Sequence, residues 1–96
     1  MANEHIGERL RTLRQLAGIS ARDLDRLAVR TEGHANLIET RPDSAVQTDV
    51  ASDYARALGA SLDYLIAGKG AAPTEAKVRV AVAKARARLK RTGTDG

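Results

Sequence analysis

Two short amphipathic segments joined by a very short connection, within residues 20–39, most constrain what this chain can fold into. Ser20 is followed three residues later by Asp23, a spacing like that of a capping box, so a helix is predicted to begin near Ala21. The apolar residues that follow lie on one helical face for barely two turns: Leu24, Leu27 and Ala28.

Thr31 is positioned to cap a second helix, predicted over residues 31–39. Ala35 and Ile38 are its inward residues. This assignment turns four other residues outward, where they are free to touch another molecule: Glu32, Gly33, Asn36 and Leu37.

The spacing LxxLAxxTxGxxxxIE in this stretch resembles the helix-turn-helix of the phage-repressor and Cro-like proteins, the XRE family. The resemblance runs from about Ile6 to Ile66, and its most typical flanks are IGERLRTLR and YARALGASLDYLI. It implies an all-α fold, a compact five-helix repressor-like bundle, to which this chain adds a basic C-terminal helix.

The family places its third helix in the DNA major groove. By resemblance, the base-reading candidates are Arg30, Thr31, Glu32, Gly33, His34, Asn36 and Leu37. The phosphate-binding candidates are Arg11, Ala21 through its backbone, Arg22, Arg30 and Arg41. The negative charge of Glu32 would need a specific base contact or neutralisation by Arg30. Arg14 and Glu39 are expected to form a structural salt bridge between the first and third helices.

The chain departs from the family pattern at several positions. The glutamine that often opens the second helix is Ala21, the turn glycine is Val29, and the glycine after the third helix is Arg41. The apolar positions after the turn and before Ile38 hold Arg30 and Ala35. A slightly different turn could absorb these changes, since a non-glycine residue adopts positive φ at modest cost. Equally, a copy of the motif that no longer reads DNA in the usual way would show them.

The remaining helices of the bundle are predicted from the spacing of apolar residues and from the capping residues and glycines at their ends. Asn3 is a candidate N-cap for a first helix that stops at Gly18, with the inward residues Ile6, Leu10, Leu13 and Ala17 and the opposite-face residues Arg9, Arg11 and Gln15. Residues 40–44 form a loop around Pro42. A fourth helix is predicted over Thr48–Leu58, closed by Gly59, and a fifth runs from the cap Ser61 to Gly68.

The sequence predicts a C-terminal region that is separate from the bundle. Residues 1–68 form the predicted helix-turn-helix domain, 69–73 a linker, 74–91 a basic amphipathic helix and 92–96 a disordered tail. Residues 1–70 carry nine Lys or Arg against ten Asp or Glu, whereas 71–96 carry seven against two. The helix has three open interpretations: pairing with a symmetry mate, lying along phosphates, or a frayed segment that aids solubility.

Composition narrows the function classes. The chain has no Cys, Phe or Trp, so the core must be aliphatic, and neither a disulfide nor a thiolate metal site can form. His5 and His34 are isolated, and the serines occupy caps or loops, so no catalysis, metal or cofactor is expected. Without an apolar run of membrane length, a cytoplasmic protein in a bacterial or phage-infected cell is expected.

The predicted function is a sequence-specific transcriptional regulator that binds a palindromic DNA operator as a homodimer. The dimer contacts would come from the fifth and C-terminal helices, through Leu62, Leu65, Ile66, Val78, Val82, Ala85 and Leu89. Two alternatives stay open. One is an antitoxin-like autoregulator whose C-terminal helix holds a protein partner, and the other is a bundle repurposed for protein–protein interaction.

Overall fold

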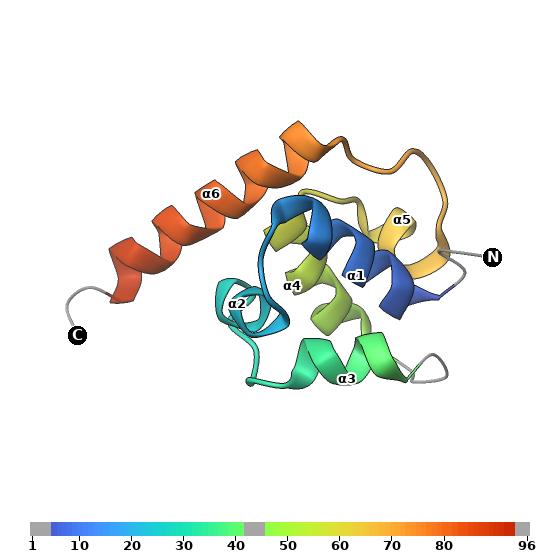
Figure 1. The fold of residues 1–96 in the computed structure, drawn as a ribbon, viewed down its shortest axis with the longest axis horizontal. Coiled ribbons are helices and arrows are strands. Elements are labelled where there is room, and N and C mark those ends of the chain that lie inside the picture. Colours follow the sequence, from blue (N-terminus) through green and yellow to red (C-terminus); the bar gives the residue numbers. More distant parts are fainter. Residues whose placement is uncertain (1–4, 42–45, 94–96) are drawn as a thin grey trace.

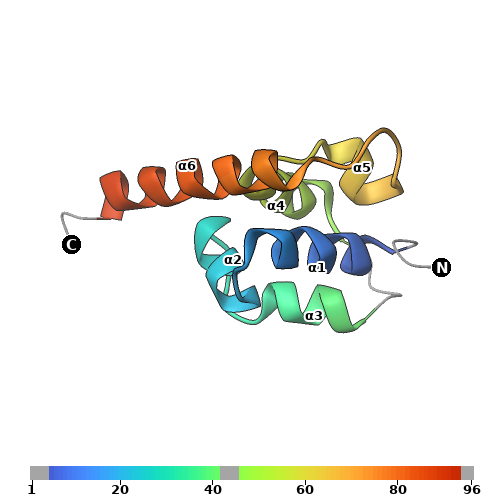
Figure 2. The ribbon, with the colours of Figure 1, turned by 45° about the horizontal axis from the view of Figure 1, so that its top comes forward.

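The described residues, 5–41 and 46–93 of this computed structural model, form only helices and no strand. The helices are α1 (Ile6–Ala17), α2 (Ala21–Leu27), α3 (His34–Thr40), α4 (Thr48–Leu58), α5 (Leu62–Ala67) and α6 (Glu75–Gly93). Figures 1 and 2 show α1 and α4 in the middle of the molecule, with α3 on one side and α6 on the other. The all-α class predicted from the sequence is confirmed.

Helices α1 and α2 end where their sequence signals place them. Gly18 closes α1 in the left-handed conformation, at φ 70°. Ser20 caps α2, because its Oγ accepts a hydrogen bond from the Asp23 N–H at 3.0 Å. Helix α1 begins at Ile6 with His5 at the N-cap position; the predicted cap, Asn3, lies outside the described residues.

Helices α4 and α5 also match their predicted bounds. Gly59 ends α4 with φ 72°, and Ser61 caps α5 by accepting a hydrogen bond from the Tyr64 N–H. Gly68 ends α5. The local signals therefore give the correct helices here, because Gly59, Ser61 and Gly68 each supply a hydrogen bond to a free helix end.

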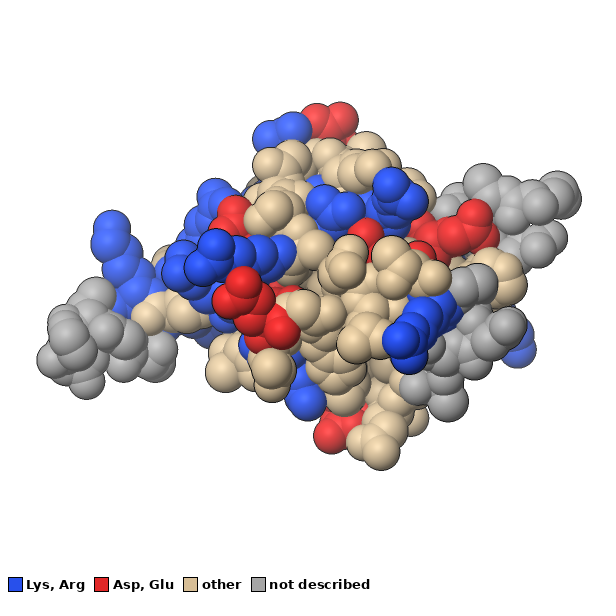
Figure 3. All heavy atoms as spheres, turned by 60° about the horizontal axis from the view of Figure 1, so that its bottom comes forward, with Lys and Arg blue, Asp and Glu red and all other residues tan. Residues whose placement is uncertain are grey.

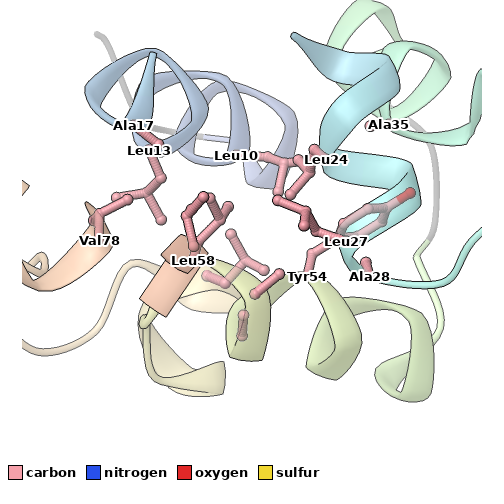
Figure 4. Packing of buried hydrophobic residues seen from close by; sticks show 14 of the residues in the cluster. Leu10, Leu13, Ala17, Leu24, Leu27, Ala28, Ala35, Tyr54, Leu58 and Val78 are labelled. Atoms are coloured by element: carbon pink, nitrogen blue, oxygen red, sulfur yellow. The ribbon is translucent and has the colours of Figure 1, made fainter. Parts of the chain in front are cut away.

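The core lies between α1, α2, α4 and α6. Figure 4 shows Leu10 of α1 beside Leu24 of α2, with Leu13 of α1 on the other side of Leu58 of α4. These four side chains and that of Tyr54 in α4 are at most 1% exposed, and Tyr64 of α5 is a second buried ring, at 7%. The core is aliphatic, as the composition predicted. No helix among the described residues is long and apolar enough to cross a membrane.

Helix α6 is part of the bundle and not a separate tail. Its inner residues Val78, Val82 and Ala85 are at most 4% exposed, and the helix packs against α1, α2 and α4. In Figure 4, Val78 points toward Leu13 of α1. The predicted separation was therefore wrong: residues 69–73 are a connection within one body, because the bundle leaves an apolar face that α6 covers.

The close fit of α6 on α4 depends on Gly59. A Cβ at this position would lie 2.9 Å from the Ala81 Cβ and 3.1 Å from the Lys77 carbonyl oxygen. Helix α6 starts after Thr74, whose Oγ1 accepts a hydrogen bond from the Lys77 N–H, and it ends at Gly93, two residues beyond the predicted end.

Arg9 corrects a second prediction. It was assigned to the exposed face of α1, but it is only 3% exposed. Arg9 is four residues before Leu13 and therefore shares its face of the helix. Its guanidinium donates hydrogen bonds to the Leu65 and Ile66 carbonyl oxygens at the end of α5, at 2.8 and 2.6 Å. These carbonyls lack a helical partner, so Arg9 ties α1 to α5.

Candidate nucleic-acid interface

The connection between α2 and α3 is longer than the sequence predicted. Its backbone turns at Val29, with φ 58°, and again at Gly33, with φ 96°. Helix α3 begins at His34, and the Thr31 carbonyl accepts the His34 N–H at 3.1 Å. Thr31 is therefore not the cap, and the prediction of a helix over residues 31–39 was wrong at its start. The left-handed Gly33 breaks the helical path before His34.

The start of α3 is held by Asp25 of α2. Its carboxylate accepts hydrogen bonds from the Gly33 N–H at 2.9 Å and the Ala35 N–H at 3.0 Å. A third bond comes from the Tyr54 hydroxyl of α4, at 2.5 Å. Asp25 is 1% exposed. One buried carboxylate thus takes the place of a local N-cap and joins three helices.

Tyr54 completes this site from the α4 side. Burial of its ring, and then the hydrogen bond to Asp25, raise the pKa of the Tyr54 hydroxyl, so the phenol stays protonated and donates. His34 lies against the same ring, edge to face, with centroids 6.2 Å apart. His34 is thus partly buried against α4 and is not directed outward as a base-reading candidate should be.

The far end of α3 is held by Arg14 of α1. Its Nε and Nη2 donate to the two carboxylate oxygens of Glu39 at 2.8 and 2.9 Å. This bond to Glu39 raises the pKa of Arg14. Helices α1 and α3 also approach closely at Gly7, where a Cβ would lie 2.3 Å from the Ile38 carbonyl oxygen. The predicted salt bridge is present.

The outward face of α3 is small and almost uncharged. Asn36 and Leu37 are exposed, Leu37 by 44%, while Ala35 and Ile38 are buried beneath them as predicted. Figure 3 looks onto this side of the molecule, where uncharged surface occupies the middle and charged groups are gathered around it. This face can offer an amide and an isobutyl group.

Two predicted DNA-contacting arginines are engaged within the chain. Arg30 Nη1 lies 2.8 Å from Asp53 Oδ2 of α4, a contact that raises the pKa of Arg30. Arg30 is therefore turned toward α4 and does not neutralise Glu32, as the sequence had suggested. Arg22 forms that pair instead, with 3.3 Å between its Nε and Glu32 Oε2. Both partners are largely exposed, so the pair is weak and easily exchanged.

The other phosphate candidates lie where a ligand can reach them. Arg11 on α1 and Arg41 after α3 are exposed, and Ala21 stands at the start of α2. Thr31, Glu32 and Gly33 are also exposed, but they lie in the turn. The structure gathers Asn36, Leu37 and the turn on one side of the molecule.

Most of the predicted dimer contacts are unavailable. Leu65, Val78, Val82 and Ala85 are buried in the protein's own core. Leu62 and Leu89 are partly buried, and Ile66 is 41% exposed. The assignment of the α6 stripe to a symmetry mate was wrong because the chain covers that stripe itself.

No role was predicted for Asp25 from the sequence. One signal was present, since Asp25 lies beside Ala28 on the helical wheel and thus borders the buried stripe of α2. A carboxylate in such a place needs donors. The sequence could not supply their identity, because Gly33 and Tyr54 lie 8 and 29 residues away.

A shallow groove of about 440 Å³ runs between α3 and the start of α4, lined by His34, Leu37 and Val50 among others. Within the described ranges, no group of three acidic or histidine side chains could hold a metal ion. No protein-family model, curated protein or solved structure matches this chain.

Proposed function

We propose that this chain is a sequence-specific DNA-binding transcriptional regulator of the repressor/Cro-like kind, with α3 as the element that enters the major groove. One observation carries the proposal. Helix α3 is fixed on its inner side by Asp25 of α2 and by Arg14 of α1, which binds Glu39, while Asn36 and Leu37 project from it without a partner role in the core. A rigid helix with unoccupied outward side chains is what base recognition needs.

The chemistry of these side chains sets the expected base preference. The Asn36 amide can donate to and accept from the adenine edge, and Leu37 can contact a thymine methyl group. In the turn, Glu32 can accept a hydrogen bond from a cytosine amino group once Arg22 leaves its ion pair with Glu32 and binds a DNA phosphate. Arg11 and Arg41 supply further phosphate contacts on the same proposal.

Helix α3 has seven residues, His34–Thr40, so one protomer reads only a short half-site. We therefore place two protomers on a palindromic site, with half-sites about 34 Å apart. Among the predicted dimer contacts, Ile66 keeps the largest exposed apolar surface and is the proposed pairing position.

The test is a fluorescence anisotropy titration with the DNA upstream of the protein's own gene and a scrambled duplex of equal length, across a salt series. The wild type should prefer the upstream fragment at ~150 mM salt. The double variant Asn36→Ala/Leu37→Ala should lose this preference while keeping its melting temperature. Gln15→Ala, on the exposed face of α1, is the matched control. An unchanged preference in the double variant would remove α3 from the interface.

A second function is favoured by the groove between α3 and α4. The groove places the half-exposed Leu37 beside Val50, so the same side of the molecule offers apolar surface to a protein. In that case α3 serves a protein–protein contact, and the wild type binds the upstream and scrambled duplexes equally.

A further inference from the structure

Helix α6 presents a second surface, on the side of the molecule opposite α3. Its solvent face is a ridge of small uncharged residues, Ala76, Val80, Ala83 and Ala87, spaced by four, three and four. Val80 is 54% exposed. The ridge is distinct from the buried stripe of the same helix, which faces α1 and α4.

Two rows of cations flank this ridge. Lys84 and Arg88 lie along one flank, and Arg86 and Lys90 along the other, each pair separated by about 6 Å along the helix axis. All four side chains are exposed. Glu75 is the single carboxylate of α6, and it is paired with Arg79 at 3.0 Å, so it does not offset these rows.

The bundle adds a fifth positive charge to one row. Arg26 of α2 lies with Arg86 and Lys90 around a groove of about 260 Å³, whose apolar lining includes Leu27 and Leu89. Asp23 lies at the same groove. The cations of two helices thus converge on one side of α6, which points to an anionic ligand.

We propose that this face of α6 binds the phosphate backbone of double-stranded DNA without reading its sequence. A helix with its side chains is about 10–12 Å across, close to the ~12 Å width of the major groove. The alanine ridge lets the helix backbone approach, and the flanking rows then face phosphates on the two groove walls. The charge pattern therefore fits a duplex better than a flat anionic surface.

The same features disfavour other occupants. A second copy of α6 on the ridge would bring like-charged rows together, which is repulsive. A membrane-surface helix needs large apolar side chains to insert, and the ridge has only alanines and one valine. An acidic protein would satisfy the charges and is the alternative that the experiment must exclude.

The placement of the two faces has a consequence for DNA binding. Helices α3 and α6 lie on opposite sides of α1 and α4, so one straight duplex does not reach both (Figures 1 and 2). The α6 face alone gives sequence-independent binding. If α3 also binds DNA, as proposed above, one protein molecule can bridge two duplexes; this bridging rests on the proposed function of α3.

The experiment measures binding to a random-sequence duplex over a salt series. The triple variant Lys84→Gln/Arg86→Gln/Lys90→Gln should lower the slope of log affinity against log salt by roughly 2–3, since each lost phosphate contact contributes about 0.9. Glutamine is a good helix former, so α6 should remain helical. The single variants Lys84→Gln, in α6, and Lys69→Gln, outside α6, each remove one positive charge. Lys69→Gln is the control and should leave the slope unchanged.

An unchanged slope in the triple variant overturns the proposal. Binding of the wild type to polyglutamate but not to the random duplex also overturns it and indicates an acidic protein partner. Failure of α3 is distinguishable: the wild type would then bind upstream and scrambled DNA equally, while the α6-dependent slope persisted and supported this inference.

Discussion

Helices α3 and α6 are held in opposite ways and leave opposite surfaces. Helix α3 is positioned by polar groups of its neighbours, Asp25 of α2 at its start and Arg14 of α1 near its end, and its outward residues Asn36 and Leu37 carry no charge. Helix α6 is positioned by an apolar stripe and turns its cations outward. Directional hydrogen bonds fix the orientation of α3, which short-range recognition of bases requires. Apolar packing of α6 instead leaves its charged side chains at the surface, where they can attract an anionic ligand over a longer range.

The largest effect is expected from Asp25→Ala, which tests the polar anchor of α3. The variant leaves the Gly33 and Ala35 N–H groups and the Tyr54 hydroxyl without their acceptor, so the free energy of unfolding should fall by about 3 kcal/mol or more. Urea unfolding measures it. Asp23→Ala is the control, and a loss for Asp25→Ala no larger than for this control would contradict the anchor.

A second pair of variants tests the apolar attachment of α6. Val78→Ala removes two buried methyl groups and should cost about 2 kcal/mol of unfolding free energy. Val80→Ala makes the same change on the exposed ridge of the same helix and should be neutral or slightly stabilising, because alanine favours helix. Equal effects in thermal unfolding would show that α6 is not attached through Val78.

A third prediction concerns pH. Because burial and Asp25 raise the pKa of Tyr54 in the folded state, the folded protein keeps a proton that the unfolded chain loses above pH ~10. This contribution to stability is complete below that pH and declines as the pH rises further. Tyr54→Phe should cost about 1–2 kcal/mol at neutral pH.

The pH dependence separates this variant from a packing defect. Urea midpoints between pH 9 and 11 should fall less steeply for Tyr54→Phe than for the wild type. Tyr64→Phe is a comparison at the other tyrosine. Parallel pH profiles for wild type and Tyr54→Phe would refute the role given to the Tyr54 hydroxyl.

The smallest effect should come from the turn that precedes α3. Val29 has φ 58° and is 81% exposed, so its β-branched side chain strains the backbone without gaining burial. Val29→Asn should stabilise the protein by about 1 kcal/mol, because asparagine tolerates this conformation. The thermal midpoint should rise, whereas a fall would mean that Val29 has a packing role.

Sequence reasoning succeeded where a signal and its partner lie close in the chain. Ser20, Ser61 and Gly59 marked helix ends that the structure confirms, since each acts within about one turn. The Arg14–Glu39 bridge spans 25 residues, and it came from the family resemblance and not from local pattern.

It failed where distant residues compete with a local signal. Thr31 resembles a cap, but Asp25 supplies that function from α2 and moves the start of α3 to His34. The sequence predicted that Arg30 contacts DNA, but in the structure Arg30 forms a salt bridge with Asp53 of α4. The α6 stripe predicted a contact correctly, yet periodicity cannot say whether the surface that covers it belongs to the same chain.

Gly59 shows how a single missing side chain can set the direction of a whole surface. The end of α4 touches α6 at Lys77 and Ala81, near the first turns of that helix. Any side chain there would act as a wedge that lifts those turns, and the helix would pivot on its buried residues further along. The exposed cations beyond Ala83 would then face a different direction. An uncharged position at the end of α4 therefore determines the orientation of the charged surface of α6.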